Sequence, residues 1–319
     1  MQLGGFYLDN PVIFAPMAGV SDLPYRKIIA KFKPGLICGE MVSSKGLLQQ
    51  NKKTRKMVSH HNHFVPFSQQ IFGKDPDLMA KAAKEIEKLG VDIIDINMGC
   101  PAPKITKIGE GSALLKTPDI AVEIVRKVVS SVKTPVTVKM RKGFDNYNCD
   151  VLELANRIQE QNVVAIAIHG RTCEQQYSGT ADWDIITKFK EELDIPVIGN
   201  GDIFRPEDAK EMLSQTGCDA VMIGRGTMGN PWLIDRVKKE INEEPHYSLK
   251  KEEFINVIND HFREAINYYG EHGVVHMRKH IAWYLKGLPN NARIKEKIMK
   301  ETDKNTVWNI LNEYIEEIY

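Results

Sequence analysis

Cys100 is the residue whose type and position best suit proton-transfer chemistry. It lies between Gly99 and Pro101, directly after an apolar run, in a chain whose five cysteines include no CxxC pair. Scattered cysteines in odd number predict neither a disulfide framework nor a zinc site, and we expect no metal. A thiol with an ordinary pKa of roughly 8.5 is mostly protonated at neutral pH and can act as a general acid. A lone cysteine is more often a buried core residue, so both interpretations stay open. The other four are expected in the core (Cys38) or as loop or packing residues (Cys149, Cys173 and Cys218).

Polar or glycine-rich residues follow seven of the chain's short apolar runs. One such tip is unremarkable, but unpaired polar groups are costly to bury. Seven tips that meet at one rim would therefore predict a ligand site. The tips are Ala15-Pro16-Met17-Ala18-Gly19, Gln69-Gln70, Asn97-Met98-Gly99-Cys100-Pro101, Lys139 with Arg141, His169-Gly170-Arg171, Asn200-Gly201-Asp202 and Gly224-Arg225-Gly226.

The last two tips suggest phosphate binding. Open backbone amides at Gly201 and Gly224, with the charge of Arg225, suit an anion. In β/α barrels the loops after strands 7 and 8 form a common phosphate site. Glycine turns are also frequent in ordinary packing, so these tips alone leave that alternative open. Lys139 is similarly ambiguous, because a lysine inside the apolar run 136–140 either points into a ligand site or pairs with a carboxylate.

The elements that would position these residues read as alternating strands and helices. Buried parallel strands appear as continuous apolar runs because helices cover them. Eight such units in about 240 residues predict a (β/α)8 TIM barrel of the α/β class. The expected strands are Val12–Ala15, Leu36–Gly39, Val65–Ile71, Ile93–Ile96, Val136–Met140, Val164–Ile168, Val197–Gly199 and Ala220–Ile223. Asp75-Pro76, Thr117-Pro118 and Arg205-Pro206 have the pattern of helix starts.

The chain changes character near its end. Residues 243–246 look like a linker, and from Leu249 onward the spacing is helical, so we expect a barrel domain at 1–245 and a small all-helical domain at 246–319. The first ten residues carry no basic region followed by an apolar stretch, and no run approaches the roughly 20 apolar residues of a membrane span. A cytoplasmic protein is expected.

Positive charge is concentrated in two segments although the net charge is only +1. Lys31 to His63 contains seven Lys or Arg and one acid, and Val274 to Lys300 again contains seven against one. Such segments are compatible with a polyanionic partner. On charge alone, solvated helix faces are the more common explanation.

Six motifs taken together resemble the tRNA-dihydrouridine synthases, most closely their bacterial DusB-type branch. The motifs are APMAGVSDLPYR (15–26), NMGCP (97–101), GSALL (111–115), VKMRKG (138–143), HGRT (169–172) and GNGDI (199–203). The resemblance covers essentially the whole barrel and, more weakly, the helical tail.

The resemblance implies an enzyme whose barrel binds FMN tightly but non-covalently. NADPH reduces the flavin, which passes a hydride to C6 of a tRNA uracil while a cysteine, here Cys100, protonates C5. Beside a flavin, the Lys139 ammonium would stabilise the reduced anion near its N1–C2 edge, and the Gln70 amide would suit the N3–C4 edge. The implied cofactor-binding residues are Pro16, Met17, Ala18, Gln70, Lys139, His169, Asn200, Gly201, Asp202, Gly224 and Arg225.

The expected partner is tRNA, with no membrane contact and no obligate protein partner, and the protein is expected to be a monomer. Candidate contacts to the uridine and its entrance are Asn97, Arg141, Arg171, Gln175 and Tyr177. In the tail, Lys279, Trp283 and Lys286 would share one helix face. Arg278 and Arg293 complete the tail candidates. The alternative is that Trp283 and Tyr284 belong to the core.

Three other functions stay open. A flavin barrel acting on a free pyrimidine would share the fold and the Lys139 role, but would leave the basic tail unexplained. A phosphate-binding aldolase or isomerase would need no flavin. A tRNA-binding chaperone without chemistry would need neither Cys100 nor Lys139.

Overall fold

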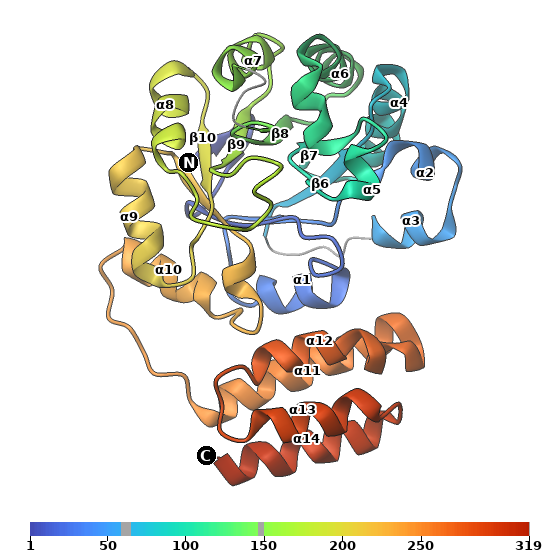
Figure 1. The fold of residues 1–319 in the computed structure, drawn as a ribbon, viewed down its shortest axis with the longest axis vertical. Helices are drawn as coiled ribbons and strands as arrows, with labels where there is room; N and C mark the ends of the chain where they lie inside the picture. Colours follow the sequence, from blue (N-terminus) through green and yellow to red (C-terminus); the bar gives the residue numbers. More distant parts are fainter. Residues whose placement is uncertain (59–64, 146–149, 319) are drawn as a thin grey trace.

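The computed structural model describes residues 1–58, 65–145 and 150–318. Cys149 and the three histidines at the end of the first basic segment lie outside these ranges. Within these ranges, the chain forms a barrel, and the carboxyl-terminal helices pack together on one side of it (Figure 1).

Eight parallel strands close into a ring, as the alternation of apolar runs predicted. The pairing passes from β4 through β3 and β11 around to β6, and the pairing of β4 with β6 closes it. The short strand β5 (Val42–Ser43) extends one edge of β6. The barrel strands are β3 (Val12–Phe14), β4 (Leu36–Cys38), β6 (Phe67–Phe72), β7 (Ile93–Met98), β8 (Val136–Arg141), β9 (Ala165–His169), β10 (Val197–Asn200) and β11 (Ala220–Ile223).

Helices surround the ring, and their starts follow from local capping. Asp75 accepts the backbone N–H groups of Asp77 and Leu78 at the start of α4, where a proline occupies the first turn. The helix that was predicted to begin at Arg205-Pro206 does so and runs to Thr216. The surrounding helices are α1 (Leu23–Ala30), α2 (Ser44–Leu48), α3 (Lys52–Met57), α4 (Pro76–Glu87), α5 (Pro103–Thr106), α6 (Pro118–Ser131), α7 (Val151–Gln159), α8 (Asp184–Glu192), α9 (Pro206–Thr216) and α10 (Leu233–Ile241).

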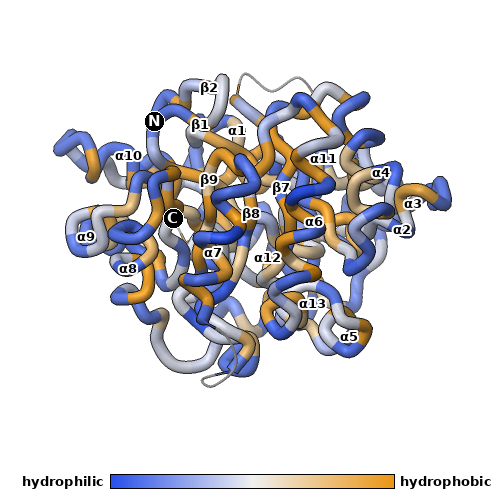
Figure 2. The backbone as a smooth tube through the Cα atoms, turned by 90° about the horizontal axis from the view of Figure 1, so that it is seen from above, coloured by the Kyte–Doolittle hydropathy of each residue, from blue (hydrophilic) through white to orange (hydrophobic). Residues whose placement is uncertain are grey.

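A two-stranded hairpin that the sequence did not predict closes the amino-terminal end of the barrel. Strands β1 (Gln2–Leu3) and β2 (Phe6–Tyr7) pair antiparallel. Leu3 and Leu8 are fully buried and pack on residues near the beginnings of the barrel strands, such as Ile13 and Ile93. Figure 2 shows the hairpin at the edge of the barrel, beside the amino terminus. The opposite, carboxyl-terminal end of the strands is therefore the end left for a site.

After α10 the described chain contains helices and no strand, in agreement with the predicted helical tail. The tail is formed by α11 (Lys251–Tyr269), α12 (Gly273–Tyr284), α13 (Asn291–Lys300) and α14 (Lys304–Ile318). Helices α11 and α12 lie nearer the barrel, and α13 and α14 lie outside them (Figure 1). Among the described helices, none has the combination of length and apolarity that crossing a bilayer requires.

The tail shares its core with the barrel. One cluster of buried apolar side chains runs without interruption from barrel strands, such as Phe14 and Ile223, to tail residues, such as Phe254 and Tyr284. Tyr25 of α1 lies at the junction, where its ring stacks on His261 of α11 with centroids 5.0 Å apart. Burial of this apolar surface holds the two parts together.

Candidate active site

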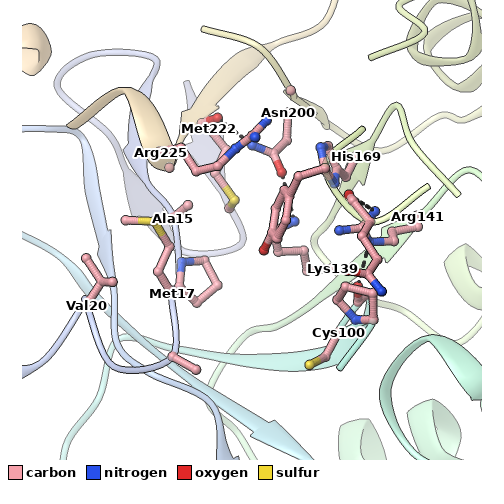
Figure 3. Close-up of a pocket in the computed structure, with 18 of the residues that line it drawn as sticks. Ala15, Met17, Val20, Cys100, Lys139, Arg141, His169, Asn200, Met222 and Arg225 are labelled. Carbon is pink, nitrogen blue, oxygen red and sulfur yellow. Dashed lines mark hydrogen bonds between the residues drawn. The ribbon is translucent and has the colours of Figure 1, made fainter. Parts of the chain in front are cut away.

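A cavity of about 570 Å³ opens at the carboxyl-terminal ends of the strands. All eleven predicted cofactor residues line it, together with Cys100, Asn97, Arg141 and Tyr177. Met17 and Ala15 lie on one side, and Cys100, Lys139 and Arg141 lie on the other (Figure 3). The volume is within the usual range for small-molecule and cofactor pockets, roughly 300–1,000 Å³.

Lys139 presents an amine to this cavity without a carboxylate partner. Its Nζ donates to Oδ1 of Asn200 at 2.9 Å, and Nδ2 of Asn200 in turn donates to the carbonyl of Met222 at 2.7 Å. Among the described residues Nζ has no carboxylate at ion-pair distance, although the charge of Asp95 acts on Lys139 from farther away. Burial lowers the pKa of Lys139 to about 8, and the charge of Arg141 adds to this effect. A bound anionic group would therefore find a cation already held in place.

A hydrogen bond to Asp95, on the neighbouring strand β7, orients the side-chain amide of Gln70. Nε2 of Gln70 donates to Oδ2 of Asp95 at 2.5 Å, and Oε1 of Gln70 accepts from Nδ2 of Asn97 at 2.7 Å. A side-chain amide has two donors and two acceptor lone pairs, so one of each remains for a ligand. Thr137 gives Asp95 a second donor at 2.7 Å. Burial raises the pKa of Asp95 to about 6.

Sequence reasoning missed two polar residues here: Gln176, which lines the cavity, and Asp95, which supports Gln70 without lining the cavity. The signal for Asp95 was present, because a carboxylate inside the apolar strand β7 needs buried partners. Other lining residues gave no signal, because they are apolar side chains of loops or strands that look like ordinary core. They include Val20, Met41, Ile203, Phe204, Met222 and Met228.

Cys100 lies at the cavity wall rather than in the core. Its backbone N–H donates to Oδ1 of Asn97 at 3.0 Å, and its carbonyl accepts from Ser112. Burial raises the pKa of the Cys100 thiol above its ordinary value, so the sulfur carries its proton at neutral pH. Cys38, Cys173 and Cys218 are buried, as packing residues should be.

His169 is a neutral side chain at the edge of the cavity. It is 6% exposed, and burial together with the cations Lys139, Arg141, Arg171 and Arg225 holds its pKa far below the usual range. A neutral imidazole offers one donor and one acceptor. The ring lies against Gly201, where an added Cβ would approach its carbon Cδ2 to 3.2 Å and where φ is +136°. An added Cβ would also come within 2.6 Å of Cβ of Ala181, so glycine at 201 lets the ring and the loop after β9 pack closely around it.

Asp202, which lines the cavity, pairs with two arginines, of which only Arg225 lines the cavity. Asp202 accepts from Arg171 at 2.6 Å and from Arg225 at 3.1 Å. Arg225 stays about one-third exposed, and its guanidinium lies over the ring of Tyr177 at 4.6 Å. The carboxylate of Asp202 therefore orients the guanidinium of Arg225. The exposed part of that guanidinium would attract a phosphate in the cavity.

Two of the predicted uridine contacts, Arg141 and Arg171, hold the loop after β9, and Arg141 also lines the cavity. Arg141 donates to the carbonyls of Gly99, Thr172 and Gln176, each at 2.8 Å. Arg171 donates to Ser178 and Gly179 and is only 2% exposed. It does not line the cavity.

The remaining three uridine candidates differ in position. Asn97 lines the cavity and bonds to Gln70 and Cys100. The side chain of Gln175 accepts the N–H of Thr172 at 2.9 Å, and Gln175 does not line the cavity. Tyr177 does line it and is 54% exposed. The loop after β9 thus presents one aromatic ring to an incoming ligand, and buried arginines support the loop.

The tail candidates do not form the single exposed face that helical spacing predicted. Nζ of Lys279 donates to the carbonyl of Gly19 in the barrel. Trp283 is partly buried, and its backbone lies against Gly229, where an added Cβ would come within 2.4 Å. Tyr284 is a core residue, 3% exposed, which bears out the alternative for that side chain.

The other three tail candidates are also divided. Arg278 donates to the carbonyl of Glu301 at 2.6 Å and so fixes the end of α13. Lys286 and Arg293 are exposed. Of the five tail candidates, Lys286 and Arg293 are therefore the two whose side chains are exposed to solvent.

Part of the first basic segment binds the tail instead of facing solvent. Lys31 pairs with Asp260, and its neighbour Lys27 in α1 pairs with Glu264 at 2.6 Å. Lys56 donates to the carbonyl of Tyr268 at 2.5 Å. The positive charge of residues 31–56 is therefore partly used in joining α1 and α3 to α11.

Comparison with known proteins gives a consistent result. The family model described as dihydrouridine synthase (Dus) matches residues 13–318. The chain is 42% identical to tRNA-dihydrouridine synthase B of Pasteurella multocida (strain Pm70) over 306 residues, 95% of this chain and 92% of that protein. It is 40% identical over 298 residues to a probable tRNA-dihydrouridine synthase of Rickettsia conorii (strain ATCC VR-613 / Malish 7), covering 92% and 90% of the two chains.

Solved structures share the fold at low sequence identity. Histamine dehydrogenase from Rhizobium sp. 4-9 superposes with a TM-score of 0.59 at 14% identity, over 83% of this chain and 50% of that one. A mutant of morphinone reductase in complex with tetrahydroNAD superposes with a TM-score of 0.54 at 14% identity, over 76% of this chain and 90% of that one. These likenesses support the barrel architecture.

Proposed function

The chain belongs to the dihydrouridine synthase family of oxidoreductases, and on that premise we propose that it reduces uridines of tRNA to 5,6-dihydrouridine with FMN and NADPH. The observation that carries the proposal is that two groups lie on one wall of the cavity. They are the protonated thiol of Cys100 and the amine of Lys139, which has no carboxylate at ion-pair distance among the described residues. The part of the chain at 1–245 would be the catalytic barrel, and the part at 246–319 would contribute to RNA binding.

The donor set of the cavity fits a flavin mononucleotide. Gln70 has one free donor and one free acceptor, as the imide-like edge of the ring requires. Lys139 lines the same cavity from β8, two strands along the sheet from Gln70 on β6, and would bind an electron-rich edge of the ring. At the other end, Arg225 and the glycine backbone at 201 and 224 suit a phosphate. When bound, FMN would supply the hydride for uracil C6 after taking it from NADPH.

The role of Cys100 follows from its protonation. Addition of a hydride at C6 of a uracil leaves negative charge delocalised over C5 and the adjoining carbonyl, so C5 needs a proton. A thiol whose pKa burial has raised holds that proton at neutral pH. Asn97 fixes the backbone of Cys100 through its Oδ1, which keeps the sulfur at the wall of the cavity.

A uracil within folded RNA must leave its stack before it can enter such a cavity. Extrusion costs a few kcal/mol, and contacts at the mouth can offset this cost. Tyr177 and Phe204 are both about half exposed and flank the guanidinium of Arg225. We infer that these rings receive the extruded nucleotide, while exposed cations elsewhere bind phosphates.

The proposal is tested by mapping dihydrouridine in tRNA from a strain that lacks the gene, by mass spectrometry, before and after the purified protein and NADPH are added. We expect new dihydrouridine at defined positions. Acid release and chromatography of the bound cofactor would identify FMN. Unmodified tRNA, with a free pyrimidine reduced in its place, would show that the enzyme acts on a small metabolite.

A further inference from the structure

The turn of residues 16–21 forms one wall of the cavity, and Pro16, Met17, Ala18 and Val20 line it. Its internal hydrogen bonds converge on Met17. The N–H groups of Val20 and Ser21 both donate to the carbonyl of Met17 at 2.9 Å, and Oγ of Ser21 accepts the N–H of Met17 at 2.8 Å. Gly19, at φ +75°, takes no part in this internal set.

Gly19 is held instead by two charged side chains from different parts of the molecule. Oε1 of Glu40, which follows β4, accepts the N–H of Gly19 at 2.5 Å. Nζ of Lys279 in α12 donates to the carbonyl of Gly19. The barrel thus holds one of the peptide groups that flank Gly19, and the tail holds the other.

Further bonds join the tail to the same region. Oδ1 of Asp22 caps α1 by accepting the N–H of Tyr25, and Oδ2 of Asp22 accepts the hydroxyl of Tyr269 in α11 at 2.8 Å. On the adjacent loop after β11, the carbonyl of Thr227 accepts the hydroxyl of Tyr25, and Gly229 lies against the backbone of Trp283. Helix α12 therefore contacts both loops that border this side of the cavity, and α11 contacts the end of the first one.

Two acids and two bases lie together where the turn at 16–21 meets the tail: Asp22 and Glu40, with Arg26 and Lys279. Burial raises the pKa values of Asp22 and Glu40, and the positive charges of Arg26 and Lys279 oppose that increase for both carboxyls. Arg26 is fully buried and donates to the carbonyl of Ser21 at 2.9 Å. If Lys279 lost its charge, two buried acids would face one guanidinium.

We propose that Lys279 is a positioning residue, which with Glu40 fixes the turn at 16–21 in the conformation that receives the cofactor. The proposal rests on the proposed function in that it takes the occupant of the cavity to be FMN. It gives the tail a second task besides RNA binding, since α12 then completes the wall of a site that otherwise belongs to the barrel.

The test compares three variants of the full chain: Lys279→Met, Lys279→Arg and, as a matched loss of an exposed lysine from the tail, Lys304→Met. Cofactor-free protein is titrated with FMN in the absence of tRNA, and hydrogen–deuterium exchange is followed in the peptide that covers residues 15–22. A charge-assisted hydrogen bond lost from Lys279→Met should weaken FMN binding about tenfold. It should also speed exchange of this peptide, while Lys279→Arg and Lys304→Met stay near the unsubstituted protein.

Each other outcome is decisive. Normal FMN affinity and normal exchange in Lys279→Met, with weaker tRNA binding, would make Lys279 an RNA contact and overturn the proposal. Failure of the unsubstituted protein to bind FMN would overturn the proposed function. In that event, exchange in the cofactor-free proteins would still decide whether Lys279 fixes the turn.

Discussion

The side-chain amide of Gln70 and the carboxylate of Asp95 lie 2.5 Å apart on neighbouring strands, both buried beneath the cavity. An ionised carboxylate accepts hydrogen bonds only. As long as Asp95 is ionised, Gln70 must turn its nitrogen downward and its oxygen toward Asn97. The orientation of the amide that meets a ligand is thus set by a residue that the ligand does not touch.

This relationship predicts a pH dependence of stability. The pKa of Asp95 is raised to about 6 in the folded protein. A raised acid stabilises the fold while protonated, fully below its unfolded pKa near 4, and this contribution is lost as pH rises through about 6. The free energy of unfolding should fall by up to roughly 3 kcal/mol across this window through Asp95 alone. Asp95→Asn should remove that component, measured by urea unfolding at pH 4.5 and 7; an equal fall in both proteins would contradict it.

Cys100→Ala should retain the flavin and lose most uridine reduction. The thiol supplies a proton and little binding, and loss of a general acid typically costs about 10²–10⁴-fold in rate. Single-turnover reduction of tRNA, started with protein already reduced by NADPH, isolates this step. Cys173→Ala, which removes a buried thiol near the site, is the matched control. A near-normal rate for Cys100→Ala would assign the proton to another group.

Lys139 should make flavin binding sensitive to alkaline pH. Its pKa is lowered to about 8, so the cofactor-free protein loses this charge as pH rises through that value. FMN affinity should decrease between pH 7 and 9 for the unsubstituted protein and change less for Lys139→Met. The same variant should slow NADPH oxidation in stopped-flow experiments without tRNA. Parallel pH profiles for the two proteins would rule out the ammonium as a flavin contact.

Exposed cations of the tail should contribute to tRNA binding through phosphates. Lys286 and Arg293 are the exposed candidates, so Lys286→Glu with Arg293→Glu should weaken tRNA binding and reduce its salt dependence. The expected reduction in the slope of log affinity against log salt is roughly 0.7–0.9 for each lost contact. Filter binding at two salt concentrations measures it, with Lys304→Glu as a control. Unchanged affinity would leave exposed lysines of the first basic segment, such as Lys45 and Lys52, as the main candidates.

The barrel could be predicted from the sequence because its strands are short, mostly apolar runs, seven of which carry polar or glycine-rich residues at their ends. A shared site at these ends could be predicted because the parallel strands of a barrel bring their carboxyl ends to one rim. This logic needs only the order of the strands, and it placed Gln70, Lys139 and Asn200 correctly around one cavity. The hairpin at Gln2–Tyr7 could not be predicted in this way, because its strands have two residues each and show no periodicity.

The tail shows what spacing alone does not reveal. Helical periodicity places Lys279 and Trp283 on one face but does not state whether that face meets solvent or protein. Tertiary contacts with Gly19 and Gly229 decide that question. The two arginines predicted near the uridine show the same limit of local sequence. Arg141 and Arg171 have the charge of phosphate ligands, yet backbone carbonyls of a loop occupy them, and nothing in the local sequence marks those carbonyls as partners.

The contact between Tyr25 and His261 also affects how the chain is made. Tyr25 is synthesised early, but the α11 and α12 rings that cover it, those of His261, His280 and Tyr284, belong to the final quarter of the chain. On the ribosome, the apolar side of α1 stays uncovered until the last helices emerge, and exposed apolar surface of this kind favours aggregation. Nascent chains that stall before α11 should therefore depend on chaperones, although every barrel strand has already been translated.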